Sequence, residues 1–331
     1  MSQAITQDGL RKLVAGWLAM GKRVAAPSRV KSDLVLYVPL KSAEQMLLEG
    51  FVRPSNSIKE FLFPKHEQLF KYKVTAEGLD LSEVEPPQTE QLVMAARPCD
   101  AAALPILDLV FNWDCPDEFY NHRRELTTVV ALACKEHDEY CFCTSVGLQP
   151  DAPRGSDVML LELGQGNYEV RCLTEKGRTL MEGRTIMSDC DASVPPGPEK
   201  RFSPGVVRDF VKSNFESPFW QSEGATCLGC GSCAYTCPTC HCFDMVDEGN
   251  PDAGARVRNW DSCQFSTFTQ HASGHNPRDN QPSRQRQRIS HKFDIYLEKF
   301  GEILCTGCGN CSRNCPVGMG VLGVLTEIGN S

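Results

Sequence analysis

Two stretches of the sequence space four cysteines in the same way and follow the last of them with a proline. The first stretch contains Cys227, Cys230, Cys233 and Cys237, and the second contains Cys305, Cys308, Cys311 and Cys315. Both fit the pattern C-x2-C-x2-C-x3-C-P, in which three thiolates hold one [4Fe–4S] cube and the fourth reaches another cube. The spacing therefore predicts two [4Fe–4S] clusters that exchange their fourth ligands.

This exchange of fourth ligands assigns each cysteine of the two motifs to one of the two clusters. We expect cluster 1 to be held by Cys227, Cys230, Cys233 and Cys315, and cluster 2 by Cys305, Cys308, Cys311 and Cys237. A pair of zinc sites is the alternative, since zinc also binds four thiolates. Zinc ribbons use paired C-x2-C knuckles rather than three equally spaced cysteines before a Cys-Pro step, so the pattern favours iron–sulfur cubes.

A second set of cysteines lies in the N-terminal half, and its members are Cys99, Cys134, Cys141 and Cys143. Cys99 and Cys134 each follow a predicted buried strand, over residues 91–96 and 127–133. If these strands are parallel neighbours, both sulfurs emerge at the same carboxyl edge of the sheet, and the loop after Cys134 brings the other two thiols back to it. We expect a third cluster there, with unligated thiols, one of them redox-active, as the alternative.

The 67 residues between the two motifs form a long insertion that holds Cys240, Cys242 and Cys263. These thiols are either further ligands, thiols near a partner's cofactor, or small buried apolar residues. Cys115, Cys172 and Cys190 have no metal-binding context and are expected to be structural. A basic run of Arg284, Arg286, Arg288, His291 and Lys292 is a solvated face, a docking surface, or compensation for the negative charge of reduced clusters.

The elements that must position these cysteines suggest two domains. Apolar periodicity predicts helices over residues 8–22 and 42–49, a strand over 33–38, and a hairpin over 157–163 and 168–173. Residues 1–186 therefore predict an α/β domain. Residues 187–205, rich in proline and glycine, predict a linker. Residues 206–331 begin with a predicted helix over 206–215 and then predict a mainly α-helical, ferredoxin-type dicluster domain with a long insertion.

Composition narrows the class of protein further. The 331 residues include 34 Lys and Arg against 42 Asp and Glu, a net charge of −8 that argues against nucleic acid as a partner. No apolar run reaches the length of a membrane span, so we do not expect an integral membrane protein. The N-terminal residues lack an export signal, and the 18 cysteines then belong in a reducing, cytoplasmic compartment, where metal or redox roles are expected.

Taken together, these motifs resemble a known family: the iron–sulfur beta subunits of cytoplasmic NiFe hydrogenases (sulfhydrogenases) and the corresponding iron–sulfur subunits of anaerobic sulfite reductase. Matching segments lie at residues 97–100, 141–143, 218–220, 237–244, 274–278 and 291–293. The resemblance implies an electron relay between a flavin subunit that handles NAD(P)H and a separate catalytic subunit. That subunit would be a hydrogenase, a sulfite or sulfur reductase, or a heterodisulfide-reductase-like complex.

The leading hypothesis is thus a non-catalytic, anaerobic electron-transfer subunit, because the clusters do the redox chemistry while the protein sets their positions and potentials. An alternative makes the chain a sulfur-compound reductase with its active site at Cys99 or Cys134 in the N-terminal domain. A third hypothesis is a structural adaptor whose clusters only hold the fold. The sequence contains no base or substrate-binding motif that favours the enzyme hypothesis.

Overall fold

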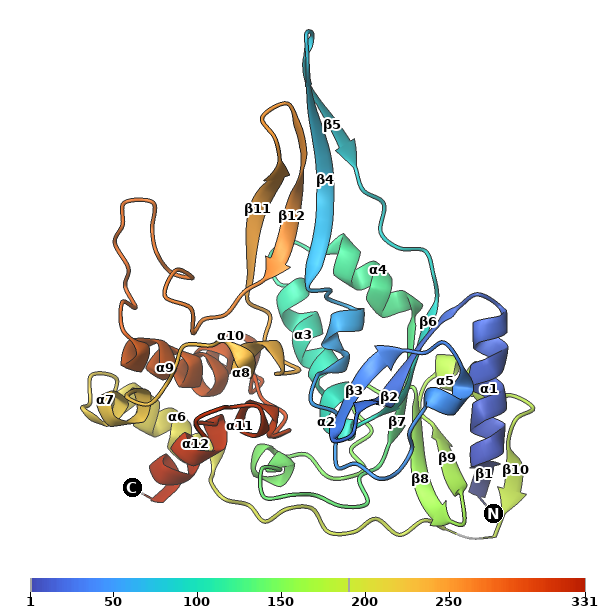
Figure 1. The fold of residues 1–331 in the computed structure, drawn as a ribbon. Helices are drawn as coiled ribbons and strands as arrows, with labels where there is room; N and C mark the ends of the chain where they lie inside the picture. The colour runs from blue at the N-terminus through green and yellow to red at the C-terminus, as the bar shows by residue number, and fades with distance from the viewer. Residues whose placement is uncertain (1, 190, 331) are drawn as a thin grey trace.

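The computed structural model describes residues 2–189 and 191–330, and its larger sheet lies in the N-terminal half (Figure 1). Eight strands lie in the order β10-β1-β9-β8-β7-β6-β2-β3. Their bounds are β1 Ser2–Thr6, β2 Arg23–Lys31, β3 Leu34–Pro39, β6 Gln91–Ala96, β7 Thr127–Leu132, β8 Val158–Gly164, β9 Asn167–Cys172 and β10 Ile186–Ser188. Strands β2, β6, β7 and β8 are parallel neighbours, and β3, β9, β1 and β10 each run antiparallel to the strands they pair with.

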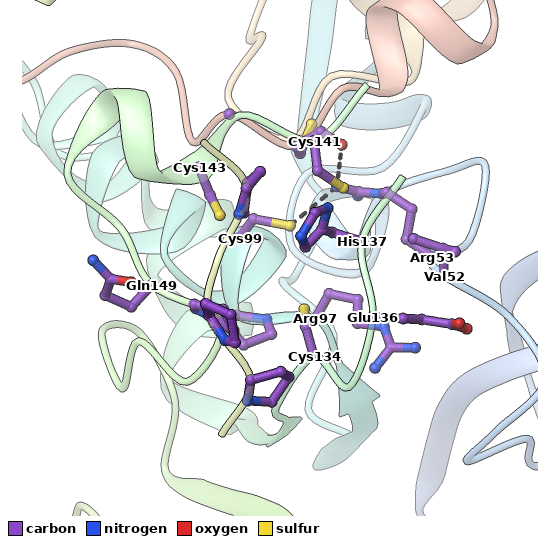
Figure 2. Close-up of a pocket in the computed structure, with 17 residues that line it drawn as sticks. Val52, Arg53, Arg97, Cys99, Cys134, Glu136, His137, Cys141, Cys143 and Gln149 are labelled. Carbon is purple, nitrogen blue, oxygen red and sulfur yellow. Dashed lines mark hydrogen bonds between the residues drawn. The ribbon is translucent and has the colours of Figure 1, made fainter. Parts of the chain in front are cut away.

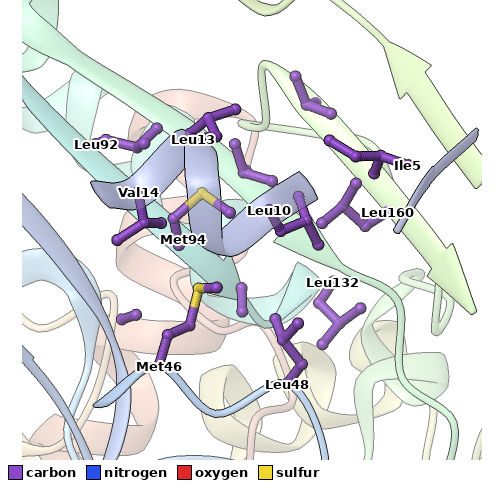
Figure 3. Packing of buried hydrophobic residues seen from close by; sticks show 14 of the residues in the cluster. Ile5, Leu10, Leu13, Val14, Met46, Leu48, Leu92, Met94, Leu132 and Leu160 are labelled. Atoms are coloured by element: carbon purple, nitrogen blue, oxygen red, sulfur yellow. The ribbon is translucent and has the colours of Figure 1, made fainter. Parts of the chain in front are cut away.

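Helices cover both faces of this sheet. Successive side chains of a strand point to opposite faces, so the buried strands present apolar side chains on both. On one face, α1 (Gln7–Ala19) packs on Leu92 and Met94 of β6 (Figure 3), and α5 (Glu175–Met181) adds Leu180 and Met181 to the same apolar cluster. On the other face, α2 (Pro98–Ala101), α3 (Ala103–Phe111) and α4 (Glu118–Leu126) pack on Val93. The central strands are thus buried on both sides, as is typical of parallel sheets.

A second, four-stranded sheet projects from the body of the molecule (Figure 1). Its order is β11-β12-β4-β5, with β4 at His66–Thr75, β5 at Gly78–Glu83, β11 at Phe243–Gly249 and β12 at Ala253–Trp260. Strand β12 of the insertion thus pairs with β4 of the N-terminal half. At its end, Trp260 is buried among Phe63 and Phe111, and Arg258 binds Glu67 of β4 at 2.5 Å.

Short helices and the insertion make up the C-terminal region. The helices are α6 Pro204–Ser213, α7 Phe219–Gly224, α8 Ser232–Tyr235, α9 Gln281–Ser290, α10 Tyr296–Phe300, α11 Asn310–Arg313 and α12 Val321–Asn330, with a π-helical turn at His291–Ile295. They share an apolar core that includes Phe202, Trp220, Phe293 and Leu325. Within the described ranges, no helix has both the length and the apolar character needed to cross a bilayer.

Most of the predicted N-terminal elements are confirmed. The predicted helix over 8–22 corresponds to α1, the strands at 33–38, 91–96 and 127–133 to β3, β6 and β7, and the hairpin to β8 and β9. The predicted helix at 42–49 is wrong, since only a 3-10 turn at Ala43–Gln45 forms there. Mixed α/β content describes the molecule, and the mainly helical character predicted for the C-terminal region is not confirmed, because β11 and β12 belong to it.

Residues 191–203, most of the predicted linker, lie outside every helix and strand but are held against the body of the molecule. Thr144 Oγ1 donates to the carbonyl of Pro198, and Arg201 N donates to Ser145 Oγ at 2.9 Å. Phe202 then enters the C-terminal core. The domain boundaries at residues 186 and 206 therefore stay a prediction. This segment and the second sheet both connect the two predicted domains.

Candidate metal centres

The first cavity is lined by all four cysteines predicted for cluster 1: Cys227, Cys230, Cys233 and Cys315. The first three come from one motif and the fourth from the other. Two neighbouring groups aim N–H donors at the sulfurs: Gln281 Nε2 lies 3.2 Å from Cys227 Sγ, and Met319 N lies 3.2 Å from Cys315 Sγ. Such donors favour the thiolate form that binds metal.

The two motifs have the same local backbone conformation, which explains why the same cysteine spacing can position thiols in both. In each, a short helix, α8 or α11, begins after a glycine in the left-handed region, Gly231 with φ 73° or Gly309 with φ 74°. Glycine takes this conformation without the steric cost that a side chain brings. The turn brings the second and third thiols of each motif to the start of a helix.

The thiols predicted for cluster 2 are Cys305, Cys308, Cys311 and Cys237. Burial raises the pKa of Cys305 to about 12 and that of Cys308 to about 11, and the negative charge of Cys237 adds to both shifts. Cys237 Sγ lies 3.3 Å from Thr239 Oγ1, which donates to the carbonyl of Leu304, so Cys237 lies beside the start of the second motif, and it does not line the first cavity. Gly307 N donates to Cys305 Sγ at 3.4 Å.

The N-terminal cavity is lined by Cys99, Cys134, Cys141 and Cys143, the four thiols predicted for cluster 3 (Figure 2). The parallel pairing of β6 and β7 places the ends of both strands at one edge of the sheet. The loop after Cys134 then carries the other two thiols to this edge, through the 3-10 turn Cys143–Val146. Gly307 and Cys308 of the second motif also line this cavity, so it adjoins the cluster 2 thiols.

Three buried cations surround the C-terminal thiols: Lys59, Arg288 and Lys292 are 2%, 3% and 2% exposed. Lys59 donates to the carbonyls of Ala234 and Cys240, and Arg288 to the carbonyl of Cys233. Lys292 Nζ lies 3.4 Å from Cys237 Sγ. Among the ion pairs of the described residues, none joins these three cations to a carboxylate.

Burying a cation without a counter-charge is costly, so negative charge is needed at this place. Burial alone would lower the pKa of Lys292, but the thiolates of Cys237 and Cys240 outweigh it and raise that pKa. Four thiolates on a cubane cluster would supply the missing negative charge. The donor set, its N–H donors and its cations therefore fit iron–sulfur clusters.

Arg53 joins the N-terminal cavity to the second motif. Its guanidinium lies 3.1 Å from both Cys99 Sγ and the carbonyl oxygen of Cys308, and it binds the buried carboxylate of Asp100 at 2.8 and 2.9 Å. Tyr37 Oη donates to the same carboxylate at 3.0 Å. Arg313 makes a similar link, from Cys141 Sγ at 3.0 Å to the carboxylate of Asp138.

The hypothesis that the basic run is a solvated face is wrong for three of its five residues. Arg284, Arg288 and Lys292 are buried, and the last two face cysteines on the inner side of α9 and the π-helical turn. Sequence reasoning missed Lys59 and Arg53 altogether. A weak signal existed for Lys59, which stands beside the apolar residues of the segment Ile58–Phe61.

The remaining cysteines fall into two groups. Cys240 lies near Cys237, and Cys242 near Cys263, so that in each pair the neighbouring thiol raises the pKa of Cys240 or Cys242. Cys115 is exposed, Cys172 donates only to the carbonyl of Gly177 at 3.7 Å, and Cys190 lies outside the described residues. In the described ranges, no three His, Cys, Asp or Glu side chains gather closely enough to hold a single metal ion.

Two comparisons with known proteins agree with this geometry. Residues 226–319 match the 4Fe-4S dicluster domain family. The chain is 29% identical, over 319 residues, to the sulfhydrogenase 2 subunit beta of Pyrococcus furiosus, and the alignment covers 92% of each protein. No solved structure matches the chain. These findings confirm the resemblance drawn from the sequence: a 4Fe-4S dicluster domain is present, it fits a role in electron transfer, and the chain is similar along most of its length to a sulfhydrogenase beta subunit.

Proposed function

We propose that this chain is a non-catalytic electron-transfer subunit that carries two [4Fe–4S] clusters in its C-terminal region and a third in its N-terminal half. Clusters 1 and 2 use the crossed ligand sets described above, and cluster 3 uses Cys99, Cys134, Cys141 and Cys143. When bound, such clusters accept and donate single electrons. The observation that carries the proposal is the first cavity, where thiols from two distant motifs surround one space beside the buried cation Arg288.

The protein's part is to fix the three sites in sequence and to balance their charge. Cys308 lies at the border of the N-terminal cavity, which supports an order in which cluster 2 stands between clusters 3 and 1. Lys59, Arg288 and Lys292 offset the negative charge of the thiolates, and Arg53 bridges the sites of clusters 3 and 2. Cations fixed this near to a cluster favour its reduced, more negative state.

The partners follow from the relative and the exposed edge of the first cavity. The similar protein is a subunit of a sulfhydrogenase, so we propose a flavin subunit that handles NAD(P)H and a catalytic redox subunit as partners. Cys230 is exposed, and Leu228 beside it is 67% exposed. This edge of the first cavity is where electron exchange with a partner subunit would be shortest.

Anaerobic iron and acid-labile sulfide analysis, combined with electron paramagnetic resonance, tests the proposal. Three clusters correspond to about twelve iron per chain and two clusters to about eight. Stoichiometric zinc with negligible iron would refute the cluster assignment. Reduction of the clusters by NAD(P)H in the presence of the flavin partner tests the relay, and clusters that stay oxidised in that mixture indicate the structural adaptor instead.

The reductase alternative also rests on the N-terminal cavity, since Glu136 and His137 line it beside the thiols. It predicts that the purified chain reduces a small sulfur compound with an artificial electron donor, and that Cys99→Ser abolishes this turnover. The relay predicts no turnover by the isolated chain under the same conditions. The two functions are thereby separated by one assay.

A further inference from the structure

The insertion brings two thiols together that none of the three proposed clusters uses. Cys242 precedes β11 and accepts, through its carbonyl, a 3.0 Å hydrogen bond from Asp261 N at the end of the β11–β12 ladder. The chain then turns at the buried Ser262 and returns Cys263 to the same place. The two cysteines are neighbours there, and the thiols of Cys242 and Cys263 shift the pKa of one another.

We propose that Cys242 and Cys263 form a redox-active dithiol that converts reversibly to a disulfide by exchange with small-molecule disulfides. Two antiparallel segments hold the two cysteines beside one another, and close approach of two cysteines is the first requirement of a disulfide. Both residues are partly exposed, which gives a small reagent access. The proposal goes beyond the relay and does not depend on it.

The surroundings give the two thiols different tasks. The thiol of Cys242 lowers the pKa of Cys263, and the nearby cation Arg288 lowers it further, whereas the thiol of Cys263 raises the pKa of Cys242. The thiolate is the attacking form in exchange reactions. Cys263 is therefore the attacking thiol and Cys242 the resolving thiol.

The reaction balances without any bound metal. Cys263 thiolate attacks one sulfur of a disulfide R–S–S–R, so that a mixed disulfide forms and one R–S⁻ leaves. Cys242 gives its proton to that R–S⁻ and attacks the Cys263 sulfur, which releases the second R–S⁻. The protein dithiol is oxidised by two electrons, and the reagent is reduced to two thiols. Excess R–SH reverses both steps.

A single side chain links this pair to the first cavity. Gln264 Nε2 lies 3.8 Å from Cys263 Sγ, and Gln264 Oε1 lies 3.6 Å from Cys227 Sγ. Forming a disulfide removes the Cys263 thiolate that Gln264 faces. The oxidation state of the pair is therefore felt at a ligand proposed for cluster 1.

Anaerobic redox titration of the full chain, in buffers of reduced and oxidised glutathione, tests the proposal. At each ratio, free thiols are alkylated, and mass spectrometry locates the remaining disulfide after digestion. We expect one cross-link, between the peptides holding Cys242 and Cys263, that forms at high oxidised glutathione and reverses with excess reduced glutathione. Cys172→Ser is the matched control and should leave the cross-link unchanged, whereas Cys242→Ser and Cys263→Ser should abolish it.

Every other result overturns the proposal. A pair that stays reduced at a hundredfold excess of oxidised glutathione is not redox-active, and a cross-link between Cys240 and Cys237 identifies the wrong pair. If Cys263→Ser lowers the iron content by about four atoms, Cys263 is a cluster ligand. Iron and sulfide are measured on the same samples, so failure of the cluster assignment is seen separately from failure of the dithiol.

Discussion

The two thiol cavities are built by different means. In the first cavity, which lies in the C-terminal region, three of four thiols come from one motif of twelve residues, and tight turns at glycines set their positions. In the N-terminal cavity, the thiols come from the ends of two strands and from a loop, and the parallel sheet sets their positions. The spacing of cysteines along the sequence therefore determines the first cavity, whereas the strand order of the sheet determines the N-terminal cavity.

Their cations differ in the same way. Near the N-terminal cavity, carboxylates balance two of the cations, since Arg53 pairs with Asp100 and Arg313 with Asp138, whereas the buried Arg97 donates to the carbonyl of Phe51. Near the C-terminal thiols, Lys59, Arg288 and Lys292 are buried and contact carbonyls and sulfurs. On our proposal, the C-terminal site relies more on negative charge brought by bound clusters, and losing a cluster there should be more damaging than losing the proposed N-terminal cluster.

The largest effect is expected from removing one ligand in each cavity. Cys315→Ala should lose about four iron and unfold at a much lower temperature, because buried cations are left without counter-charge. Cys134→Ala should lose a similar amount of iron with a smaller loss of thermal stability. Iron analysis and thermal unfolding measure both, with the exposed Cys115→Ala as control. Equal destabilisation by the two variants would contradict the charge comparison.

A smaller effect on stability is expected from replacing Arg53, whose guanidinium contacts Cys99 of the N-terminal cavity and Cys308 of the second motif. Arg53→Met leaves the carboxylate of Asp100 buried without its cation, and breaking such a pair costs about 3–5 kcal/mol. Denaturant unfolding of the loaded protein measures this free energy. Tyr37→Phe removes a hydrogen bond to the same carboxylate and the acceptor of Arg97 N, and should cost less, about 2 kcal/mol. If Arg53→Met costs no more than Tyr37→Phe, Asp100 does not depend on Arg53.

Gly307 marks a close approach of the two sites. A Cβ placed there would lie 2.5 Å from the backbone of Cys143, so Gly307→Ala should force the second motif away from the N-terminal cavity. Overpacking of this kind costs about 1–3 kcal/mol. Gly318→Ala is the matched control, since Gly318 also has a positive φ, of 68°, but no atom within 4 Å. Equal unfolding free energies for both variants would show that backbone strain alone matters.

The smallest effect concerns pH at the link between Asp138 and Arg313. Burial alone would raise the pKa of Asp138, but the hydrogen bond and charge of Arg313 outweigh it and hold this pKa below its usual value. A lowered pKa stabilises the fold above the pKa of the unfolded chain, about 3.9, and this stability is lost as the pH falls through the folded pKa. Melting temperatures of wild type and Asp138→Asn should therefore differ at pH 6 and converge toward pH 3.

The same contrast explains what could be predicted from the sequence. The motif spacing was sufficient to predict that Cys227, Cys230, Cys233 and Cys315 meet around one cavity, and the apolar patterns were sufficient to predict α1, β6, β7 and the β8–β9 hairpin. The second sheet was missed because β4 and β5 are largely exposed and carry little periodicity, and their partner strands lie far away in the chain. Arg53 and Lys59 were missed because burial of a cation depends on folded surroundings that no local pattern records.

The pairing of β4 with β12 has a consequence for the integrity of the molecule. This ladder joins residues nearly two hundred positions apart, and Trp260 at its end is inserted into the apolar core of the N-terminal half. A fragment cut at the segment before α6 would expose an unpaired strand edge and an indole that is otherwise buried. We therefore expect the halves to melt in one cooperative transition and neither to fold autonomously.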